Sequence, residues 1–292
     1  MPPLHEPDAS PLDAPTELDP RFVFDFHTSS DPGDGQRWST WLTVEPLCRG
    51  PEPRPDWVVT SQAALDTDLG VLKTGKEAGV FLLERGVPDD PAQSTLMAAK
   101  RYRSEEHRSF HRSSSYSEGR RTRNSRDARA MAKKTGHGRA VAAGQWAWAE
   151  WEALTRFWSA GVPVPYPVQI DGTEILMEFI CIDGDSRTAA PRLAQTRPHG
   201  ALLRSYFDQL HDAMAELVRQ GVAHGDLSPY NILAAGDRLV VIDLPQAVDI
   251  VANPGGMDFL MRDCRNVCRW FASRGLDVDE DDLFAELVAS AF

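Results

Sequence analysis

The chain has 292 residues, of which 42% are hydrophobic and 25% are charged, the composition of an ordinary soluble globular protein. Its formal net charge of −12 argues against a protein whose whole surface binds nucleic acid. No apolar run is long enough to span a membrane, and the acidic, proline-rich start lacks the apolar core of a secretory signal. The four cysteines include no C-x-x-C pair, so we expect free thiols, no zinc site and a cytoplasmic location.

Residues 1–55 contain many prolines and show little periodicity, so we expect them to form a disordered tail. Three large apolar residues interrupt this composition. Trp38, Trp41 and Leu42 are candidates for a short docking element within the tail.

Short apolar runs at 69–72 and 80–83 flank a glycine-containing segment at 73–79, and this pattern predicts a strand, a loop and a second strand. Glycine in such a loop lets backbone amides approach phosphate oxygens. Gly70 to Lys76 also satisfies G-x-x-x-x-G-K, the start of a Walker A loop. However, Glu77 stands where that loop carries Ser or Thr, and a strand follows where the loop would open a helix. We therefore reject a P-loop NTPase.

A third predicted strand at 95–100 ends in Lys100, and a strand lysine near a glycine loop can pair with nucleotide phosphates. Residues 101–139 then form a basic insert in an otherwise acidic protein. A solvated loop is the plainer interpretation of this insert. The functional interpretation is a docking segment for nucleic acid or for an acidic partner.

Apolar residues recur at helical spacing over 140–160, which predicts a helix that Gly161 ends. Glu150 and Glu152 both lie on this helix, and a glutamate there could pair with Lys100; Glu150 is expected to be solvated. The remaining predicted elements are a hairpin at 164–180 with an Asp-Gly turn, an amphipathic helix at 200–220, and two closing helices at 256–271 and 280–291.

The segment from His224 to Asn231 follows a helical pattern and precedes an apolar run that ends in Asp243. Asp226 and Asn231 have the five-residue spacing of a kinase catalytic loop. Phosphoryl transfer from a magnesium nucleotide needs one carboxylate near the attacking hydroxyl, and an amide oxygen and a second carboxylate near the metal. These residues therefore predict phosphoryl transfer.

The whole set of motifs resembles the RIO kinases, atypical members of the protein-kinase-like superfamily, and within them the RIO-one type in a short, bacterial-type form, over roughly residues 60–290. The matching segments are Thr74-Gly75-Lys76-Glu77-Ala78 with Lys73 in place of a family serine, Trp148-Ala149-Glu150-Trp151-Glu152, Met177-Glu178-Phe179-Ile180, Ala190-Pro191-Arg192-Leu193, Asp226-Leu227-Ser228-Pro229-Tyr230-Asn231, Ile242-Asp243-Leu244-Pro245-Gln246, and the stretch from Asp258 to Val267. Each motif is weak alone, and their order makes the resemblance specific.

The resemblance implies an α+β, protein-kinase-like bilobal fold, with a small β-rich N-lobe at 56–180 and a reduced, mainly helical C-lobe at 181–292. It implies ATP with Mg²⁺ or Mn²⁺, and serine/threonine protein kinase activity on an unknown protein substrate. In some family members the aspartate matching Asp243 is itself phosphorylated, which suggests an ATPase or autophosphorylation cycle.

The site residues follow from the same resemblance. Asp226 would be the catalytic base, Lys100 would hold phosphates, and Asn231 and Asp243 would be metal ligands, Asp243 also counting as catalytic. The nucleotide-binding residues would be Thr74, Gly75, Lys76, Glu77, Ala78, Lys100, Met177, Glu178 and Ile180, together with Glu152 as the helix partner of Lys100.

Two alternative functions stay open. The first is a small-molecule phosphotransferase of the aminoglycoside or choline kinase type, although Ser228 and Tyr230 stand where those enzymes usually carry His and Gly. The second is an ATPase-type assembly factor that binds RNA or a ribosomal particle through the basic insert. Gly225, just before Asp226, stands where typical protein kinases carry an arginine that docks a phosphorylated activation loop. Its absence argues against control by such a loop.

The basic insert also contains serines among its arginines, at positions 109, 113, 114, 115 and 117. We suggest that this segment is an autophosphorylation or partner-docking segment.

Overall fold

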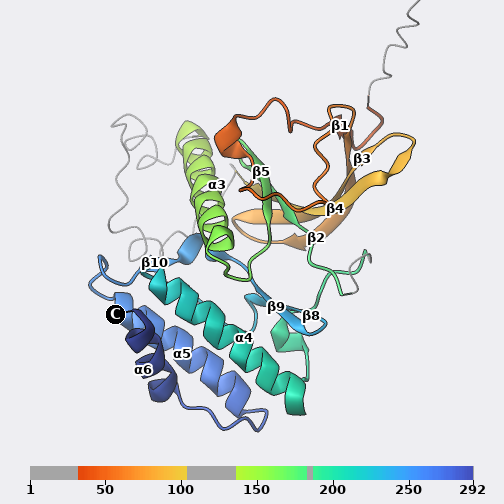
Figure 1. Cartoon of the computed structure of the whole chain (residues 1–292). Helices are drawn as coiled ribbons and strands as arrows, with labels where there is room; N and C mark the ends of the chain where they lie inside the picture. The colour runs from red at the N-terminus through yellow and green to blue at the C-terminus, as the bar shows by residue number, and fades with distance from the viewer. Residues whose placement is uncertain (1–31, 104–135, 183–186, 292) are drawn as a thin grey trace, which may run out of the picture.

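The computed structural model describes residues 32–103, 136–182 and 187–291 (Figure 1). A curled antiparallel sheet occupies one half of the molecule and a group of helices the other, with a long helix beside the sheet (Figure 1). The strands are β1 Gln36–Trp38, β2 Leu65–Thr74, β3 Ala78–Val87, β4 Asp90–Tyr102, β5 Pro167–Asp171, β6 Glu174–Glu178, β7 Val222–Ala223, β8 Ile232–Ala235, β9 Arg238–Val241 and β10 Val248–Asp249. The α-helices are α3 Gly136–Ser159, α4 Gly200–Arg219, α5 Gly256–Ala272 and α6 Glu280–Ala291, and the short 3₁₀ helices are η2 Pro46–Cys48, η3 Leu193–Gln195 and η4 Leu244–Gln246.

The large sheet has six strands in the order β1-β2-β3-β4-β6-β5, and every neighbouring pair is antiparallel. The β2–β3 hairpin encloses the glycine loop, and the β5–β6 hairpin turns at Asp171 and Gly172, where Gly172 has the positive φ that such a turn requires. Both hairpins were predicted from apolar runs and turn residues. The strand predicted at 95–100 is β4, which is longer than predicted and carries Lys100 near its end.

One face of this sheet packs against α3. Trp151, Leu154 and Phe157 of α3 are buried in the main core cluster, together with Leu82 and Ile175 of the sheet. Neighbouring members of this set lie three positions apart, so they share one side of the helix. The prediction of a helix at 140–160 is confirmed, and the helix begins four residues earlier.

The opposite face of the sheet is covered by the segment before β2. Trp41 is only 3% exposed and packs with Met97, Tyr166 and Leu176 in a second core cluster. Residues 32–55 are therefore ordered structure, and the prediction of a disordered tail is wrong for them. The prediction failed because the segment consists of turns, one short strand and a 3₁₀ turn, which have no regular hydrophobic repeat in the sequence. Residues 1–31 lie outside the described residues.

The helical half contains α4, α5, α6, the β8–β9 hairpin and a two-stranded sheet in which β7 pairs with β10. The predicted apolar stripe of α4 is buried, with Leu203, Leu210, Met214 and Leu217 in the core. Helices α5 and α6 lie where the sequence predicted them. Within the described ranges, no helix is long and apolar enough to cross a membrane.

The four cysteines are free thiols, as predicted. Burial raises the pKa of Cys264 to about 12 and that of Cys268 to about 11, and both side chains lie in the main core. The division into lobes near residue 180 stays a prediction, and nearly all of the predicted insert at 101–139 lies outside the described residues.

Candidate active site

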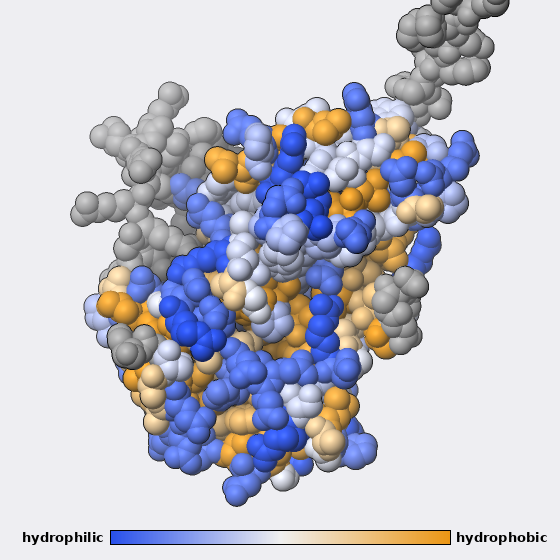
Figure 2. Space-filling model, viewed as in Figure 1, coloured by the Kyte–Doolittle hydropathy of each residue, from blue (hydrophilic) through white to orange (hydrophobic). Residues whose placement is uncertain are grey.

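A cleft of about 1030 Å³ lies between the sheet and the helical half. Figure 2 shows this region as a hollow with hydrophobic residues inside and hydrophilic residues around it. Its lining includes most of the predicted nucleotide-binding residues: Gly75, Lys76, Glu77, Ala78, Lys100, Met177, Glu178 and Ile180, together with Asp226 and Asp243. Thr74, Glu152 and Asn231 were predicted site residues but are not among the residues that line it.

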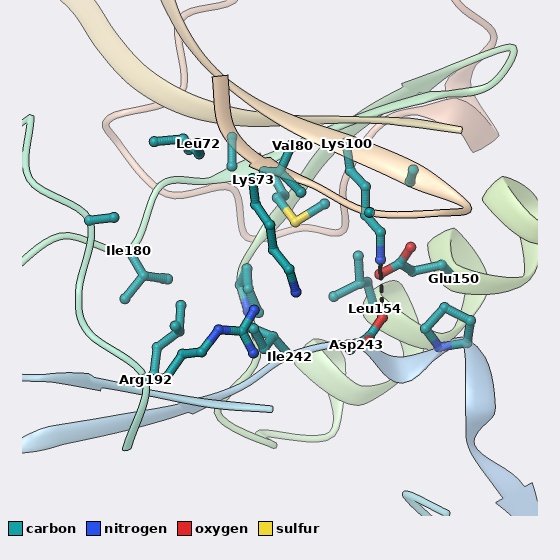
Figure 3. Close-up of a pocket in the computed structure, with 18 of the residues that line it drawn as sticks. Leu72, Lys73, Val80, Lys100, Glu150, Leu154, Ile180, Arg192, Ile242 and Asp243 are labelled. Carbon is teal, nitrogen blue, oxygen red and sulfur yellow. Dashed lines mark hydrogen bonds and ion pairs between the residues drawn. The ribbon is translucent and has the colours of Figure 1, made fainter. Parts of the chain in front are cut away.

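Lys100 links the two halves of the molecule at one end of the cleft (Figure 3). Its ammonium donates to Glu150 Oε1 at 2.6 Å and to Asp243 Oδ1 at 3.3 Å. Burial acts to lower the pKa of Lys100, but the carboxylates of Glu150 and Asp243 outweigh it and raise that pKa above its ordinary value. Lys100 is therefore a fixed cation in the cleft.

Glu150 is held from two sides. Its Oε1 accepts from Lys100, and its Oε2 accepts a short hydrogen bond from the Tyr102 hydroxyl. Burial and then the charge of Glu150 raise the pKa of Tyr102 well above its ordinary value, which keeps this hydroxyl a donor. With only 3% of its surface exposed, Glu150 is the paired, buried glutamate of α3.

The assignment of Glu152 as the partner of Lys100 is therefore wrong, and so is the expectation that Glu150 is solvated. Glu152 is exposed on α3. Residues two apart on a helix point to nearly opposite sides, so only one of the two glutamates can face the cleft. The apolar stripe decides which: Glu150 lies three or four positions from buried Ala147 and Leu154, and Glu152 does not.

Asp226 and Asn231 lie on the loop between β7 and β8. Asp226 is exposed at the cleft, where its carboxylate can meet a substrate. The Asn231 side chain is largely buried, and its Nδ2 donates to the carbonyl of Asp226 at 2.9 Å. That hydrogen bond fixes the amide orientation and leaves Oδ1 as the oxygen that a metal could use.

Asp243 lies two residues after the end of β9 and has a left-handed backbone conformation, with φ 71° and ψ 54°. A non-glycine residue rarely adopts this conformation, and such strain concentrates at functional sites. Burial acts to raise the pKa of Asp243, but the neighbouring Lys100 ammonium outweighs it and lowers that pKa. Asp243 is therefore an ionised carboxylate aimed into the cleft beside Lys100 (Figure 3).

Helix α5 fixes the backbone of the loop that carries Asp226. The buried carboxylate of Asp263 accepts hydrogen bonds from the N–H groups of Gly225 at 2.8 Å and Leu227 at 2.9 Å. Asn266 donates to the carbonyl of Leu227 at 3.0 Å. The residues on either side of Asp226 are thus held from α5, while its own carboxylate faces outward.

The sequence contained Asp263 and Asn266 in a matching motif, but their roles were not predicted. The sequence does contain a pattern that points to a structural role for Asp263. It falls on the apolar face of an amphipathic helix, three or four positions from Leu260 and Val267. A polar residue at a core position needs hydrogen-bond partners, and here the loop backbone supplies them. Burial raises the pKa of Asp263, although His224 and the two N–H donors act against it.

The site fits a magnesium nucleotide. Leu72 and Ile180 lie at the end of the cleft away from Lys100, where a purine base could lie, and the apolar side chains of Val80 and Met177 also line the cleft (Figure 3). Mg²⁺ binds through one or two protein carboxylates and completes its shell with substrate phosphates and water, and Asp243 provides one such carboxylate in the cleft.

A bilobal α+β architecture with this set of side chains in its cleft defines a protein-kinase-like phosphotransferase. The model of the RIO domain matches residues 91–283. The chain is 34% identical over 220 residues to the RIO-type serine/threonine-protein kinase Rio1 of Haloferax volcanii, covering 75% of this chain and 68% of that protein. The chain belongs to the RIO kinase family, as the motifs predicted.

Other relatives match over shorter segments. RIO3 of Mus musculus is 34% identical over 143 residues, which is 48% of this chain and 27% of RIO3. Among solved structures, the Rio2 kinase–ADP/Mg²⁺–phosphoaspartate complex from Chaetomium thermophilum has a TM-score of 0.50 and 18% identity, with coverage of 76% of this chain and 65% of that one. This likeness confirms the predicted bilobal kinase-like fold.

Proposed function

We propose that the chain is an ATP-dependent RIO-type serine/threonine kinase that requires Mg²⁺. The observation that carries the proposal is that one cleft holds the Lys100 ammonium between Glu150 and Asp243, with Asp226 on the same lining. Catalysis of phosphoryl transfer consists mostly of positioning and electrostatic stabilisation, and the grouping of these charges in one cleft supports the proposal.

The residues have distinct roles in this proposal. Asp226 orients a substrate hydroxyl and accepts its proton as the oxygen attacks the γ-phosphorus and the bond to the β-phosphate breaks. Lys100 neutralises the phosphates, and Glu150 keeps it in place. Asn231 Oδ1 and the Asp243 carboxylate would hold Mg²⁺, which when bound neutralises charge on the phosphate oxygens.

The test measures phosphate transfer from labelled ATP by the wild-type protein, Asp226→Ala and Asp243→Asn. We expect each variant to lose transfer by at least about 100-fold, because each removes a group that acts on the reacting atoms. Asp226→Ala should still bind ATP, since its carboxylate faces the acceptor. If neither variant loses transfer, the assignment of this site is wrong.

The acceptor of the phosphate needs a separate assay. The Rio2 complex from Chaetomium thermophilum contains a phosphoaspartate, and we propose Asp243 as the corresponding acceptor for an ATPase or autophosphorylation cycle in this chain. Its carboxylate lies in the cleft and is ionised. A protein-bound phosphate that hydroxylamine releases, and that Asp243→Asn lacks, would support this cycle; an acid-stable phosphate on serine would contradict it.

The remaining expectations stay proposals. They are a protein substrate, an RNA or ribosomal partner that binds the insert at 101–139, and a cytoplasmic location. The alternative of a small-molecule phosphotransferase predicts transfer to small hydroxyl compounds without any added protein, and the labelled-ATP assay can be run with both kinds of acceptor.

A further inference from the structure

Three cations line the cleft without a predicted role in catalysis or in nucleotide binding, and one of them, Arg262, donates to the carbonyl of Gly225. The other two are Lys73 of β2 and Arg192, which directly precedes η3. Figure 3 shows Lys73 reaching across the cleft from the sheet toward Arg192 on the opposite wall. Neither side chain forms an ion pair with a carboxylate among the residues that the structure describes. These two positive charges therefore have no carboxylate in direct contact with them in this part of the structure.

A β-bulge aims Lys73 into the cleft. Leu72 and Lys73 are consecutive residues, yet both line the cleft. In a regular strand consecutive side chains point to opposite faces, so one of the two would point away. The pairing of β2 with β3 shifts register between Val71 and Lys73, which is the irregularity that lets both side chains face the same way.

Hydrogen bonds to neighbouring elements fix the backbone at Arg192. Arg192 forms an isolated β-bridge with Leu233 of β8, and its N–H donates to Gln195 Oε1 at 3.0 Å. The N–H of Ala234 donates to the carbonyl of Pro191 at 2.9 Å. Arg192 is thus attached to the hairpin that begins directly after Asn231, so its position is coupled to that of the catalytic loop.

The two cations disfavour each other in the absence of an anion. Burial, followed by the charge of Arg192, lowers the pKa of Lys73, and Lys100 acts in the same direction. Asp243 opposes this effect, but its carboxylate already accepts from Lys100 at 3.3 Å. A ligand with negative charge between the two walls would remove this repulsion.

The family motifs do not specify either side chain. Lys73 stands where the glycine-loop pattern has serine, and Arg192 occupies the open position of the A-P-x-L segment. Figure 3 places Lys73 between Ile180 at the apolar end of the cleft and Lys100 at the catalytic end. A nucleotide with its base at the apolar end and its phosphates extending toward Lys100 would pass its first phosphate by Lys73.

We propose that Lys73 and Arg192 form an anion subsite that binds the base-proximal phosphate of the nucleotide from both walls of the cleft. The proposal rests on the proposed function and assigns two further residues that determine affinity for the nucleotide. Arginine binds phosphate through a planar fork and lysine as a point charge, so the pair can hold one phosphate from two directions.

The test uses Lys73→Ser, which restores the residue of the family pattern, and Arg192→Gln. Arg219→Gln is the matched control, because it removes one positive charge from the end of α4, where Arg219 pairs with Glu216. Binding of Mg-ATP, Mg-ADP, adenosine and tripolyphosphate is measured by calorimetry on the full chain, without turnover. We expect each cleft variant to weaken ATP and ADP by about five- to tenfold, as for loss of one charge-assisted hydrogen bond. Adenosine should bind the cleft variants within about twofold of wild type.

Thermal unfolding provides a second measurement that excludes a folding defect. Without ligand, Lys73→Ser should melt no lower than wild type, because the substitution removes a repulsion. With saturating Mg-ATP the order should reverse, since the wild type gains more binding free energy. A variant that melts lower in both conditions would contradict the proposal.

The outcomes separate this subsite from the proposed function. Unchanged ATP affinity in both cleft variants overturns the subsite, even if transfer falls, because the pair would then act on the acceptor. Equal weakening of adenosine and ATP also overturns it. If the wild type does not bind ATP, the proposed kinase function fails, and weaker binding of tripolyphosphate to the two variants still decides the anion subsite.

Discussion

At the scale of single residues, one glutamate determines where Lys100 points. Glu150 accepts from Lys100 and from Tyr102, and all three side chains are largely buried. A lysine has four rotatable bonds, so an ammonium without a fixed partner would sample positions away from the phosphates. Glu152 lies two residues further along α3, carries the same chemical group and faces solvent.

These two glutamates provide a matched pair of variants. We expect Glu150→Gln to lower kcat/KM for ATP-dependent transfer by about 100-fold, because misplacement of a catalytic group by about 1 Å has an effect of that size. Glu152→Gln should stay within about twofold of wild type. Steady-state kinetics with Mg-ATP checks both, and equal losses in the two variants would show that α3 has a general structural role.

At the scale of elements, the segment before β2 completes the sheet. The six-stranded sheet has two faces, and α3 covers only one of them. Trp41 covers the other face from a stretch of turns, and Arg54 lies over its ring at 4.8 Å from the centroid. The segment therefore belongs to the folded domain, and the lysine-bearing strand β4 lies between its cluster and the cleft.

Removal of this cover should destabilise the whole domain. We expect Trp41→Ala to lower the free energy of unfolding by about 3–5 kcal/mol, the usual cost of removing a buried aromatic side chain. The neighbouring Leu42 is 51% exposed, and Leu42→Ala should change stability by less than about 0.5 kcal/mol. Urea unfolding of the full chain distinguishes the two. A Trp41→Ala loss as small as that of Leu42→Ala would mean that the segment is not part of the core.

At the scale of the whole molecule, the ion pair between Lys100 and Asp243 connects the sheet to the helical half. The pKa of Asp243 is lowered in the folded protein, so folding favours its ionised form. The stabilisation from this group is present above the unfolded pKa of about 3.9 and is lost as pH falls through the folded pKa. Lys100 has a raised pKa, so its contribution is lost only as pH rises above about 10.4.

This linkage predicts a specific pH dependence. Between about pH 6 and pH 8 the stability difference between wild type and Asp243→Asn should be constant, and below about pH 4 it should shrink toward zero. Urea unfolding of both proteins at a series of pH values measures the difference. Asp263, whose pKa is raised, is present in both proteins, so its opposite contribution cancels. A difference that stays constant down to about pH 2 would show that Asp243 has no stabilising charge partner.

Particular residues show how far sequence reasoning reached. The strands beside the glycine loop, the helices α4 to α6, and the site residues Lys100, Asp226 and Asp243 were predicted from local pattern and motif order, because each depends on periodicity or spacing along the chain. Glu150 was missed, because two glutamates on one helix differ only in the side that packing buries. The role of Asp263 was missed because it depends on contacts across more than thirty residues.

By itself, the sequence determined the family, the order of the elements and the chemical groups of the site, since these are properties of residue type and spacing. Only the tertiary structure decided which glutamate pairs with Lys100, that residues 32–55 cover the sheet, and that Lys73 faces Arg192. The physical reason is the same in each case. Burial, backbone irregularities such as the bulge in β2, and contacts between distant segments arise only when the elements pack together.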